Sequence, residues 1–516
     1  MSYFSFLGHP MNVKRCLSFL AVCVVSLFLA FVPTSFFGYN DQGGLLFTLT
    51  QQRVIAIFVF TALMWILEVI PTWTTSVIAI VSILLTTSNK GLGFLISSQT
   101  DSMLQNPDIL NQLADKNMTI AEAVDKAPKL LGLTNYKDIM ASFADPVIML
   151  FLGGFVLAFA ATKVGLDVQL AKIMLKPFGN KPKNVLLGVL LVIGVFSMFM
   201  SNTATAAMML TFLTPVLLTL PADGGGRISL ALAIPIAANI GGMGTPIGTP
   251  PNAIALGALQ EAGYTITFVD WMLRMVPLVL LLLFIAWFIL TKMFPFKAKT
   301  IELKIESKPT KTTPFQKYVV WVTFALTIIL WIGESVFKVN SNIVAMIPFA
   351  VFSATGILKA RDLEHINWAV LWMVAGGFAL GTALNQTGLA SNLIQNIPFS
   401  QWSALVVMLA GGLICYFLSN FISNSAAANL VVPILVVVGT AMSGNESFEA
   451  LGGLQAMIIG IAIAASVAMC LPVSTPPNAL AHSTGMITTK QMATMGIILG
   501  VIGLGLGYAM LIFVGF

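Results

Sequence analysis

Two short polar sequences interrupt apolar stretches and share one pattern. Residues 197–203 read SMFMSNT, and residues 419–425 read SNFISNS. In each, two serines four residues apart lie on one helix face, one turn from each other. Hydroxyl and carbonyl oxygens gathered near a helix end suit a hard monovalent cation. The helix that begins after each tip presents free N–H groups and a positive dipole end, which favour an anion.

A second pair of motifs breaks two apolar helices. Residues 241–252 read GGMGTPIGTPPN, and residues 471–478 read LPVSTPPN. Proline removes backbone donors, so neither stretch is expected to continue as an α-helix through the membrane. Either motif alone is usually interhelical packing or a simple bend. Because both occur twice, we interpret them as a binding site built from broken helices.

Composition places these motifs in a membrane. Of the 516 residues, 57% are hydrophobic and only 9% are charged, whereas a soluble domain carries about 25% charged residues. The net charge of +6 comes from basic residues in loops between apolar spans. This is typical of membrane topology and not of a nucleic-acid-binding surface. The four cysteines show no metal-ligand spacing and are interpreted as small buried residues.

The sequence predicts an all-α polytopic membrane protein with eleven transmembrane helices plus two re-entrant hairpins. A spanning helix needs about 20 mainly apolar residues. The predicted spans are 16–36, 53–71, 74–87, 146–163, 228–242, 270–291, 318–337, 341–358, 367–385, 453–469 and 490–514. The hairpins are 184–220 and 402–442, since a lipid-exposed polar tip is costly. Two crossings by each pair of arms remain the alternative.

Positive charge orients these spans. With a cytoplasmic N-terminus, 18 of the 26 Lys and Arg residues fall inside, and the C-terminus lies outside. The polar insert 88–142 also falls outside, and its length suggests a folded surface cap. Counting each hairpin as two crossings gives the same sidedness at every other loop. Charge therefore predicts a multi-pass protein of the plasma (inner) membrane without proving re-entrance.

Internal repetition organises the chain. GGF at 153–155 recurs at 376–378, an offset of 223, and the hairpin tips recur at 222. PIGTPPNAIA at 246–255 recurs as PVSTPPNALA at 472–481, with seven of ten residues identical. Trp65 and Glu68 match Trp331 and Glu334 at an offset of 266, because the first half holds the insert. Both glutamates lie near span ends, where a role at a helix terminus is as plausible as one in transport.

Five crossings per half is an odd number, so the halves are predicted to be inverted repeats, with the site near the midplane where they meet. The predicted parts are a tail and first span at 1–50, a first repeat at 51–291, a basic cytoplasmic linker at 292–317 and a second repeat at 318–516.

Together, these motifs resemble the divalent anion/sodium symporter family, the sodium-coupled dicarboxylate, citrate and sulfate carriers. The resemblance extends from about residue 54 to residue 516 and includes WILEVIP at 65–71. It implies a homodimer in the lipid bilayer whose mobile domain carries the site across the membrane, elevator-fashion. It also implies Na⁺ as the coupling ion and a small divalent anion as the substrate. The Thr-Pro-Pro-Asn form of the second break favours symport, since the family's exchangers differ there.

The resemblance also assigns residues. The first sodium site maps to Ser197, Ser201, Asn202 and Gly248, and the second maps to Ser419, Ile422 (backbone), Asn424 and Ser474. The substrate maps to Asn202, Thr203, Thr249, Asn424, Ser425, Thr475 and Pro476. Ser425 stands where the family usually has Thr, which keeps the hydroxyl and could alter substrate choice.

Other functions agree less well with these residues. A C4-dicarboxylate such as succinate is the expected substrate, with sulfate or citrate transport, or anion exchange, as alternatives. A proton-coupled or arsenite-type exporter would need an acidic residue near the middle of the membrane. No Asp or Glu occurs in the hairpins or around the breaks, at 184–220, 237–260, 402–442 and 467–487. An intramembrane enzyme would need a nucleophile–base pair or metal ligands inside the spans. We therefore expect no enzymatic activity.

Overall fold

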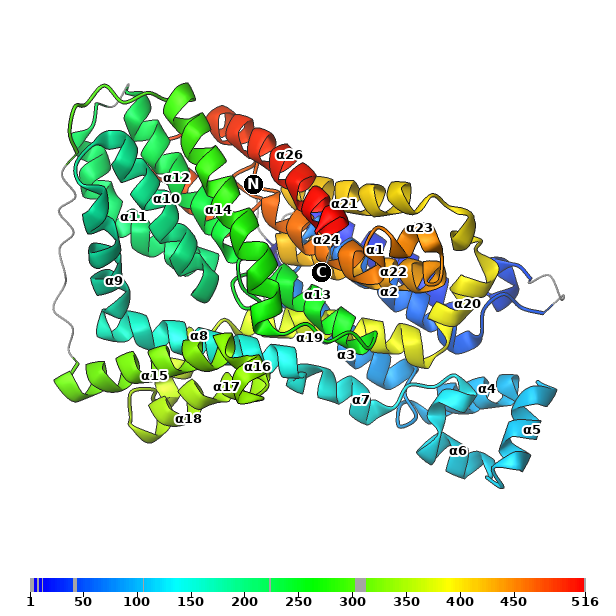
Figure 1. The fold of residues 1–516 in the computed structure, drawn as a ribbon. Helices are drawn as coiled ribbons and strands as arrows, with labels where there is room; N and C mark the ends of the chain where they lie inside the picture. The colour runs from blue at the N-terminus through cyan, green and yellow to red at the C-terminus, as the bar shows by residue number, and fades with distance from the viewer. Residues whose placement is uncertain are drawn as a thin grey trace. The chain divides into compact units, whose positions relative to one another are not determined.

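The structure is a computed structural model, and it is almost entirely helical (Figure 1). Its description covers residues 4–6, 9–11, 13–39, 44–104, 106–221, 224–301 and 312–514, with nothing said of the side chains before 13 or at 400. Strands β1 (Phe4–Phe6) and β2 (His9–Met11) pair antiparallel at the N-terminus. The rest of the described chain forms α-helices and short 3-10 helices. The all-α prediction is confirmed.

The chain divides into two compact units. Unit 1 comprises Met1–Asp145, Ala369–Ala404 and Asn429–Glu446, and unit 2 comprises Pro146–Trp368, Leu405–Ala428 and Ser447–Phe516. Each unit takes segments from both predicted repeats, so the units do not coincide with the repeats. Every contact described below lies within one unit.

Unit 1 holds the N-terminal helices, the insert and parts of three later helices. These are α1 (Val13–Phe31), α2 (Leu49–Leu67), α3 (Thr72–Thr86), α4 (Gly93–Met103), α5 (Pro107–Asp115), α6 (Ile120–Lys126), α7 (Tyr136–Ala141), α19 (Trp368–Gln386), α20 (Leu389–Asn396) and the second part of α22 (Asn424–Met442). Its 3-10 turns are Thr34–Phe37, Pro128–Leu131, Ser142–Ala144 and Phe399–Gln401, and α23 (Glu446–Glu449) lies at its boundary.

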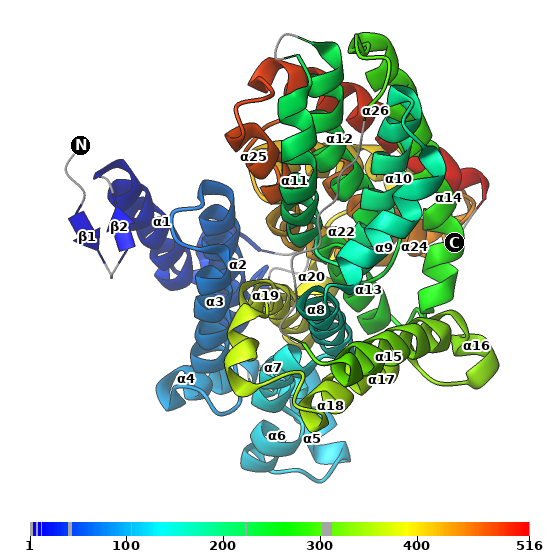
Figure 2. The same ribbon diagram turned by 90° about the vertical axis from the view of Figure 1, so that its left-hand side faces the viewer.

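Unit 2 holds both hairpin tips and both broken helices. Its helices are α8 (Pro146–Val164), α9 (Leu166–Leu175), α10 (Pro182–Phe199), α11 (Asn202–Thr219), α12 (Gly225–Gly242), α13 (Pro250–Glu261), α14 (Phe268–Met293), α15 (Pro314–Ile332), α16 (Glu334–Phe337), α17 (Ser341–Val344), α18 (Met346–Ala354), α21 (Ala404–Phe421), α24 (Gly453–Val467), α25 (Pro476–Ser483) and α26 (Thr489–Phe513), with 3-10 turns at Lys176–Phe178 and Ala360–His365. Helices α10, α11 and α12 pack together, and α25 packs against α11 and α12 (Figure 2).

Eleven helices among the described residues are long and apolar enough to cross a membrane. Seven of them match predicted spans, and the other four are the hairpin arms α10, α11, α21 and α22. Predicted spans 74–87, 341–358 and 453–469 form shorter apolar helices, and 228–242 lies in the 18-residue α12. Length alone does not separate crossing from re-entry, so the re-entrance of the hairpins stays a prediction.

Matched helix caps support the repetition. At the start of α2, Thr48 and Gln51 form a capping box, and Thr313 and Gln316 form the same box at the start of α15. These pairs lie 265 residues apart, close to the 266 of the tryptophan match. Each box satisfies free N–H groups of a first helical turn with side-chain oxygens. The first helix of each repeat therefore begins in the same way.

The matched tryptophans make the same kind of hydrogen bond. Of the matched glutamates, Glu68 is exposed and Glu334 is buried. Trp65 Nε1 donates to the carbonyl of Thr72 at 3.2 Å, and Trp331 Nε1 donates to that of Ser341 at 3.0 Å. The Glu334 carboxylate accepts from the backbone N–H groups of Phe268 at 3.0 Å and Ser341 at 3.2 Å. Glu334 is therefore a structural cap that orders two chain segments.

The insert 88–142 is folded. Its helices α4 to α6 and the turn that follows enclose a small core of Leu113, Ala123, Leu131 and Leu133. Lys90 pairs with Asp125 at 2.8 Å on its surface.

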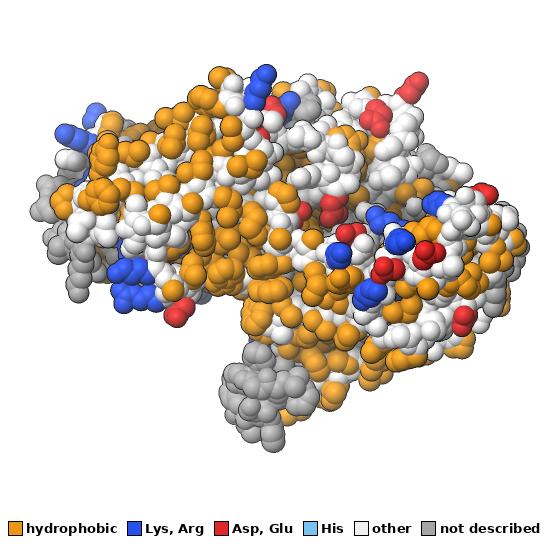
Figure 3. Space-filling view, turned by 90° about the horizontal axis from the view of Figure 1, so that it is seen from below, with side chains coloured by type: hydrophobic (Ala, Val, Ile, Leu, Met, Phe, Trp, Pro, Cys, Tyr) orange, Lys and Arg blue, Asp and Glu red, His pale blue; other side chains and the backbone are white. Residues whose placement is uncertain are grey.

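Hydrophobic side chains cover much of the face drawn in Figure 3, and Lys and Arg gather there in small groups. Phe31 and Phe417 are among the large apolar side chains that stay exposed, at 76% and 64%. Such exposure fits a surface that faces lipid.

Candidate functional site

The first hairpin tip is a tight turn between two helices. Helix α10 ends at Phe199, Met200 and Ser201 are extended, and α11 begins at Asn202. The Ser201 hydroxyl accepts from the N–H of Ala204 at 3.2 Å. Ser201 is therefore an N-cap, and its side chain is already used to hold the start of α11.

Four oxygen-bearing groups converge beneath this tip. The buried Ser197 hydroxyl lies 2.7 Å from the Asn202 amide oxygen and 2.6 Å from the Ala238 carbonyl oxygen. The same end of the Asn202 amide lies 3.2 Å from the carbonyl oxygens of both Ala238 and Gly248. The structure thus brings together Ser197, Asn202 and Gly248, three of the four residues assigned to the first sodium site, and it adds Ala238.

The Asn202 amide can serve this cluster in either of two orientations. With its nitrogen facing the cluster, its two N–H donors have three acceptors within reach, the oxygens of Ser197, Ala238 and Gly248. With its oxygen there, four oxygens face one another and share only the Ser197 proton. In that second orientation the oxygens repel one another when no cation is bound, and the arrangement becomes favourable when they surround a cation.

Glycines allow the tip and the first break to approach this closely. A Cβ on Gly242 would clash with the Asn202 side chain, and one on Gly248 would clash with the Gly242 carbonyl. A larger residue at 242 would push the break away from the tip, and one at 248 would force apart two parts of the break itself. This explains why the first break is rich in glycine.

The second tip repeats the arrangement. The buried Ser419 hydroxyl donates to the Asn424 amide oxygen at 2.8 Å and lies 3.1 Å from the Ala465 carbonyl oxygen. The Ser423 hydroxyl accepts from the N–H of Ala426 at 3.3 Å, as Ser201 does in the first tip. Ala465 lies 227 residues after Ala238, so the carbonyl partner is duplicated as well.

The asparagine of each break holds the broken helix together. Asn252 Nδ2 donates to the carbonyls of Gly242 at 3.1 Å and Thr245 at 2.8 Å. In the second break, Asn478 Nδ2 donates to the carbonyls of Met469 at 2.8 Å and Leu471 at 3.0 Å. These carbonyls lost their helical partners where the helix ends. Both asparagines are therefore structural, a role that the sequence analysis did not assign.

A network of side-chain hydrogen bonds links the two predicted repeats inside unit 2. Asn239, which is fully buried on α12, donates from Nδ2 to the Thr475 hydroxyl and to Asn478 Oδ1, both at 3.1 Å. The Thr475 hydroxyl also accepts from the N–H of Asn478 at 3.3 Å. With both acceptor positions occupied, the Thr475 hydroxyl proton must point elsewhere, so this group is set as a donor.

The matching position in the second repeat is different. Ser466 stands 227 residues after Asn239, and its buried hydroxyl has no partner among the described residues. The oxygen of Asn252, which corresponds to Asn478, is likewise unpartnered within the described chain. Serine is shorter than asparagine, so the bridge made by Asn239 is not duplicated.

The remaining predicted residues are less tightly joined. Ser474 is buried, and its hydroxyl bonds to the backbone of Leu471 instead of reaching Asn424. Thr249 and Ser425 are buried, whereas Thr203 and Pro476 are exposed. The Ile422 N–H closes the last turn of α21 on Leu418. No hydrogen bond in the described structure joins these residues to the two serine–asparagine pairs.

Charged side chains do not form this site. Within the described ranges, no group of three or more His, Cys, Asp or Glu side chains is placed to hold a metal ion. His482, just after the second break, meets the Thr489 hydroxyl at 3.0 Å in an exposed position. The oxygens of the tips are neutral hydroxyl, amide and carbonyl groups, and these suit a weakly bound monovalent cation better than a transition metal.

Comparison with known proteins identifies the family. The pattern of the citrate transporter family (CitMHS) matches residues 118–452. An uncharacterized transporter of Haemophilus influenzae is 35% identical over 400 residues, covering 72% of this chain and 82% of its own length. The sodium-dependent dicarboxylate transporter SdcS of Staphylococcus saprophyticus is 30% identical over 401 residues, covering 70% and 75%. A sodium-dependent high-affinity dicarboxylate transporter 3 of Caenorhabditis elegans is 30% identical over 441 residues, covering 73% and 75%.

The chain belongs to this citrate transporter family of membrane transporters, which agrees with the resemblance to the divalent anion/sodium symporters. The fold has a solved counterpart in the YdaH transporter of Alcanivorax borkumensis, whose crystal structure is described as having an unusual topology. The TM-score is 0.50 at 13% identity, covering 74% of this chain and 88% of that one. At this identity the likeness concerns the fold alone.

Proposed function

We propose that this protein is a secondary active transporter that couples sodium to the uptake of a small divalent anion, a C4-dicarboxylate such as succinate. The observation that carries the proposal is the duplicated cluster of a buried serine, an asparagine and a backbone carbonyl below each hairpin tip. The names of the relatives support sodium and dicarboxylate as the pair of solutes.

The two clusters are proposed to hold one sodium ion each. Ser197, Asn202, Ala238 and Gly248 supply oxygens in the first repeat, with Ser201 at the tip. Ser419, Asn424 and Ala465 supply them in the second, and the Ile422 backbone and Ser474 are proposed to complete that set. Sodium in the first cluster would require the Asn202 amide to turn its oxygen inward. Its nitrogen would then face outward, free to donate to an anion.

The anion is proposed to bind between the two tips. Helices α11 and α22 begin there, and their free N–H groups and positive dipole ends favour carboxylate groups. No Lys or Arg occurs in 197–203, 241–252, 419–425 or 471–478. The bound cations would therefore supply the remaining positive field, which explains why sodium should bind before the dianion.

The hydroxyls of Thr203, Thr249, Ser425 and Thr475 are proposed to complete the anion site, together with Pro476. Thr475 has the best-defined role, because Asn239 and the Asn478 N–H occupy both of its acceptor positions. Its proton is thereby available to a carboxylate. Asn239 acts through Thr475 and is a positioning residue.

The cellular setting is part of the proposal. We propose a homodimer in the plasma (inner) membrane, with the N-terminus inside and the C-terminus outside, as the distribution of Lys and Arg favours. The hairpins would re-enter the membrane from opposite sides within inverted repeats. The site would then cross the membrane by an elevator-type movement.

Uptake into proteoliposomes tests this function. Purified protein should accumulate labelled succinate when sodium is higher outside, and accumulation should increase with an inside-negative potential. Replacing sodium with choline or potassium should abolish it, and a pH gradient should not replace sodium. Uptake that continues without sodium whenever an anion is trapped inside would establish exchange and defeat symport.

A competition panel identifies the substrate. Unlabelled succinate should compete with labelled succinate more strongly than sulfate or citrate. The family description makes citrate the specific second candidate. If citrate competes more strongly than succinate, the substrate is a tricarboxylate, and the proposed sodium sites are unaffected.

A further inference from the structure

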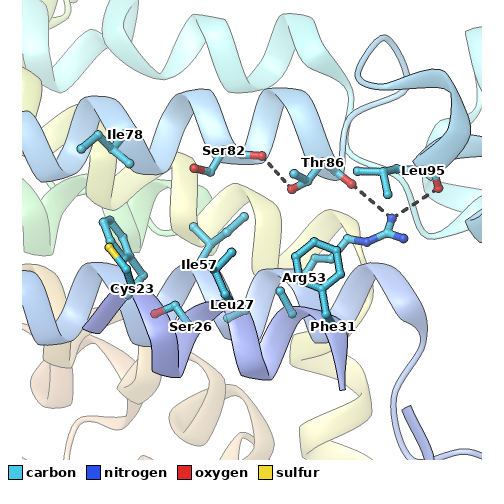
Figure 4. A pocket seen from close by; sticks show the side chains of 13 residues that line it. Cys23, Ser26, Leu27, Phe31, Arg53, Ile57, Ile78, Ser82, Thr86 and Leu95 are labelled. Atoms are coloured by element: carbon cyan, nitrogen blue, oxygen red, sulfur yellow. Dashed lines mark hydrogen bonds between the residues drawn. The ribbon is translucent and has the colours of Figure 1, made fainter. Parts of the chain in front are cut away.

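A groove in unit 1 combines a long apolar wall with one cationic end. It lies between α1, α2 and α3, with Leu95 of α4 at one end, and has a volume of about 320 Å³ (Figure 4). This is at the lower end of the range of about 300–1,000 Å³ that small-molecule sites occupy. None of the residues in the hairpin tips or the breaks lines it.

Three helices each give one stripe to the groove. On α2 the stripe contains Arg53, Ile57 and Phe60, and on α3 it contains Ile78 and Ser82. These spacings of three, four and seven residues repeat along one helix face. The groove therefore runs along the helices for about two turns, or roughly 10 Å. This direction is the one that an acyl chain takes in a bilayer.

Arg53 provides the polar end. Among the described residues, its guanidinium donates only to the backbone carbonyls of Thr86 and Leu95, both at 3.3 Å (Figure 4). No carboxylate lies within ion-pair distance of it in the part of the chain that the structure describes. A guanidinium has five N–H donors in a planar fork, so most of its capacity to bind an anion is unused.

The groove is accessible from the surface of α1. Leu27 and Phe31, which line it, are 57% and 76% exposed. Arg53 is the fifth residue of α2, so it lies near the end of that helix. An arginine near a helix end sits at the level of lipid headgroups. An apolar channel that begins at such an arginine matches a ligand with an anionic head and a hydrocarbon tail.

We propose that this groove is a binding site for a membrane phospholipid, with the lipid phosphate on Arg53 and one acyl chain between α1, α2 and α3. Arginine and phosphate match in geometry as well as charge, because two parallel N–H donors can meet two phosphate oxygens. The site is separate from the proposed transport site. It would fix α1 against α2 and α3.

Native mass spectrometry of the full chain, titrated with phosphatidylglycerol, tests this proposal. One lipid should bind tightly per chain. Arg53→Gln should weaken that binding about tenfold, since a hydrogen bond to a charged group is lost. Ser82→Trp should abolish it by filling the groove without a change in charge. Arg361→Gln, which removes an exposed arginine of unit 2, is the matched control and should bind as the unaltered protein does.

Several results would overturn the proposal. If Arg53→Gln binds the lipid as tightly as the unaltered protein, Arg53 does not contact the phosphate. If Ser82→Trp does so, no acyl chain lies in the groove. Displacement of the lipid by millimolar inorganic phosphate would assign Arg53 to a free anion. Loss of dimers in Ser82→Trp with the lipid still bound would make the groove a contact between two copies. If Arg53→Gln does not fold, Arg53→Lys keeps the charge but loses the planar fork, so it should bind the lipid more weakly than the unaltered protein. Equal affinity would then contradict the phosphate contact.

Discussion

Below the first tip, Ser197 joins Asn202 to the Ala238 carbonyl, and below the second, Ser419 joins Asn424 to the Ala465 carbonyl. Away from these clusters the two repeats diverge. Asn239 bridges to Thr475, whereas Ser466 at the matching position reaches no described partner. The parts proposed to hold cations are thus duplicated, and a part proposed to orient the anion is present once.

This difference has a physical reason. Two identical monovalent ions can be held by identical oxygen sets, so duplication preserves both. A dicarboxylate bound between two tips meets surroundings that need not be identical at its two ends. We therefore expect substitutions in the clusters to change the sodium dependence of uptake, and substitutions at Asn239 or Thr475 to change the affinity for the substrate.

The largest effect is expected at the tip asparagines. Asn202→Ala and Asn424→Ala should each abolish sodium-dependent uptake, because the amide is proposed to face a cation with its oxygen and the anion with its nitrogen. Asn→Asp should fail as well, since it removes the donor and adds a negative charge. Thr203→Ser is the control and should be mild, because Ser425 already stands at the matching position.

These variants must be measured as uptake per purified, folded protein. Near-normal uptake by either alanine variant would mean that the tips are packing elements, and the transport site would lie elsewhere.

Substitutions of the two asparagines in the breaks should lower the stability of the folded protein. Asn252→Leu or Asn478→Leu leaves two buried carbonyls without donors, at about 1–3 kcal/mol each. Both variants should show a lower thermal midpoint and a lower yield of monodisperse protein. Asn396→Leu, on the exposed part of α20, should leave the midpoint unchanged. Normal midpoints for both break variants would contradict the structural role.

A smaller and equal effect is expected at the buried serines. Ser197→Ala and Ser419→Ala each remove one oxygen from a proposed cation site, worth on the order of 1 kcal/mol or about fivefold. The sodium concentration for half-maximal uptake should rise by that factor in both variants. If sodium dependence stays unchanged in both, the assignment of these clusters to sodium fails.

The smallest effect should separate anion from cation binding. Asn239→Ser copies the second repeat into the first and removes the donor to Thr475. We expect KM for the dianion to rise about threefold, the effect of one lost neutral hydrogen bond, with kcat and sodium dependence unchanged. A change in sodium dependence of the same size would show that the bridge supports the whole site and does not orient Thr475.

Much of this site was predictable from residue types and spacing. Ser197 and Ser419 follow from a serine one turn before a polar tip, whereas the assignment of Asn202, Asn424 and Gly248 came from the family resemblance. Ala238 and Ala465 contribute backbone carbonyls, which every residue has, so side-chain chemistry gave no signal. The role of Asn252 and Asn478 could have been found, because a broken helix leaves carbonyls that need a donor.

The spans were predicted less completely than the motifs. Hydropathy located the apolar segments, but α3 and α24 form only 15 helical residues each, whereas all four hairpin arms have 18 or 19. The bridge from Asn239 to Thr475 joins residues 236 positions apart. Only the packing of α12 against α25 brings these side chains together, and a single sequence carries no signal for it.

The sodium dependence of succinate binding to the purified protein tests the central claim most directly. Two cation sites around one dianion predict no measurable binding in choline and a cooperative rise with sodium, with a Hill coefficient approaching about 2, the number of proposed sites. Ser197→Ala and Ser419→Ala should shift the curve equally. Succinate binding that is independent of sodium, or a Hill coefficient of about 1 that only one of the two variants disturbs, would contradict paired sites in the two repeats.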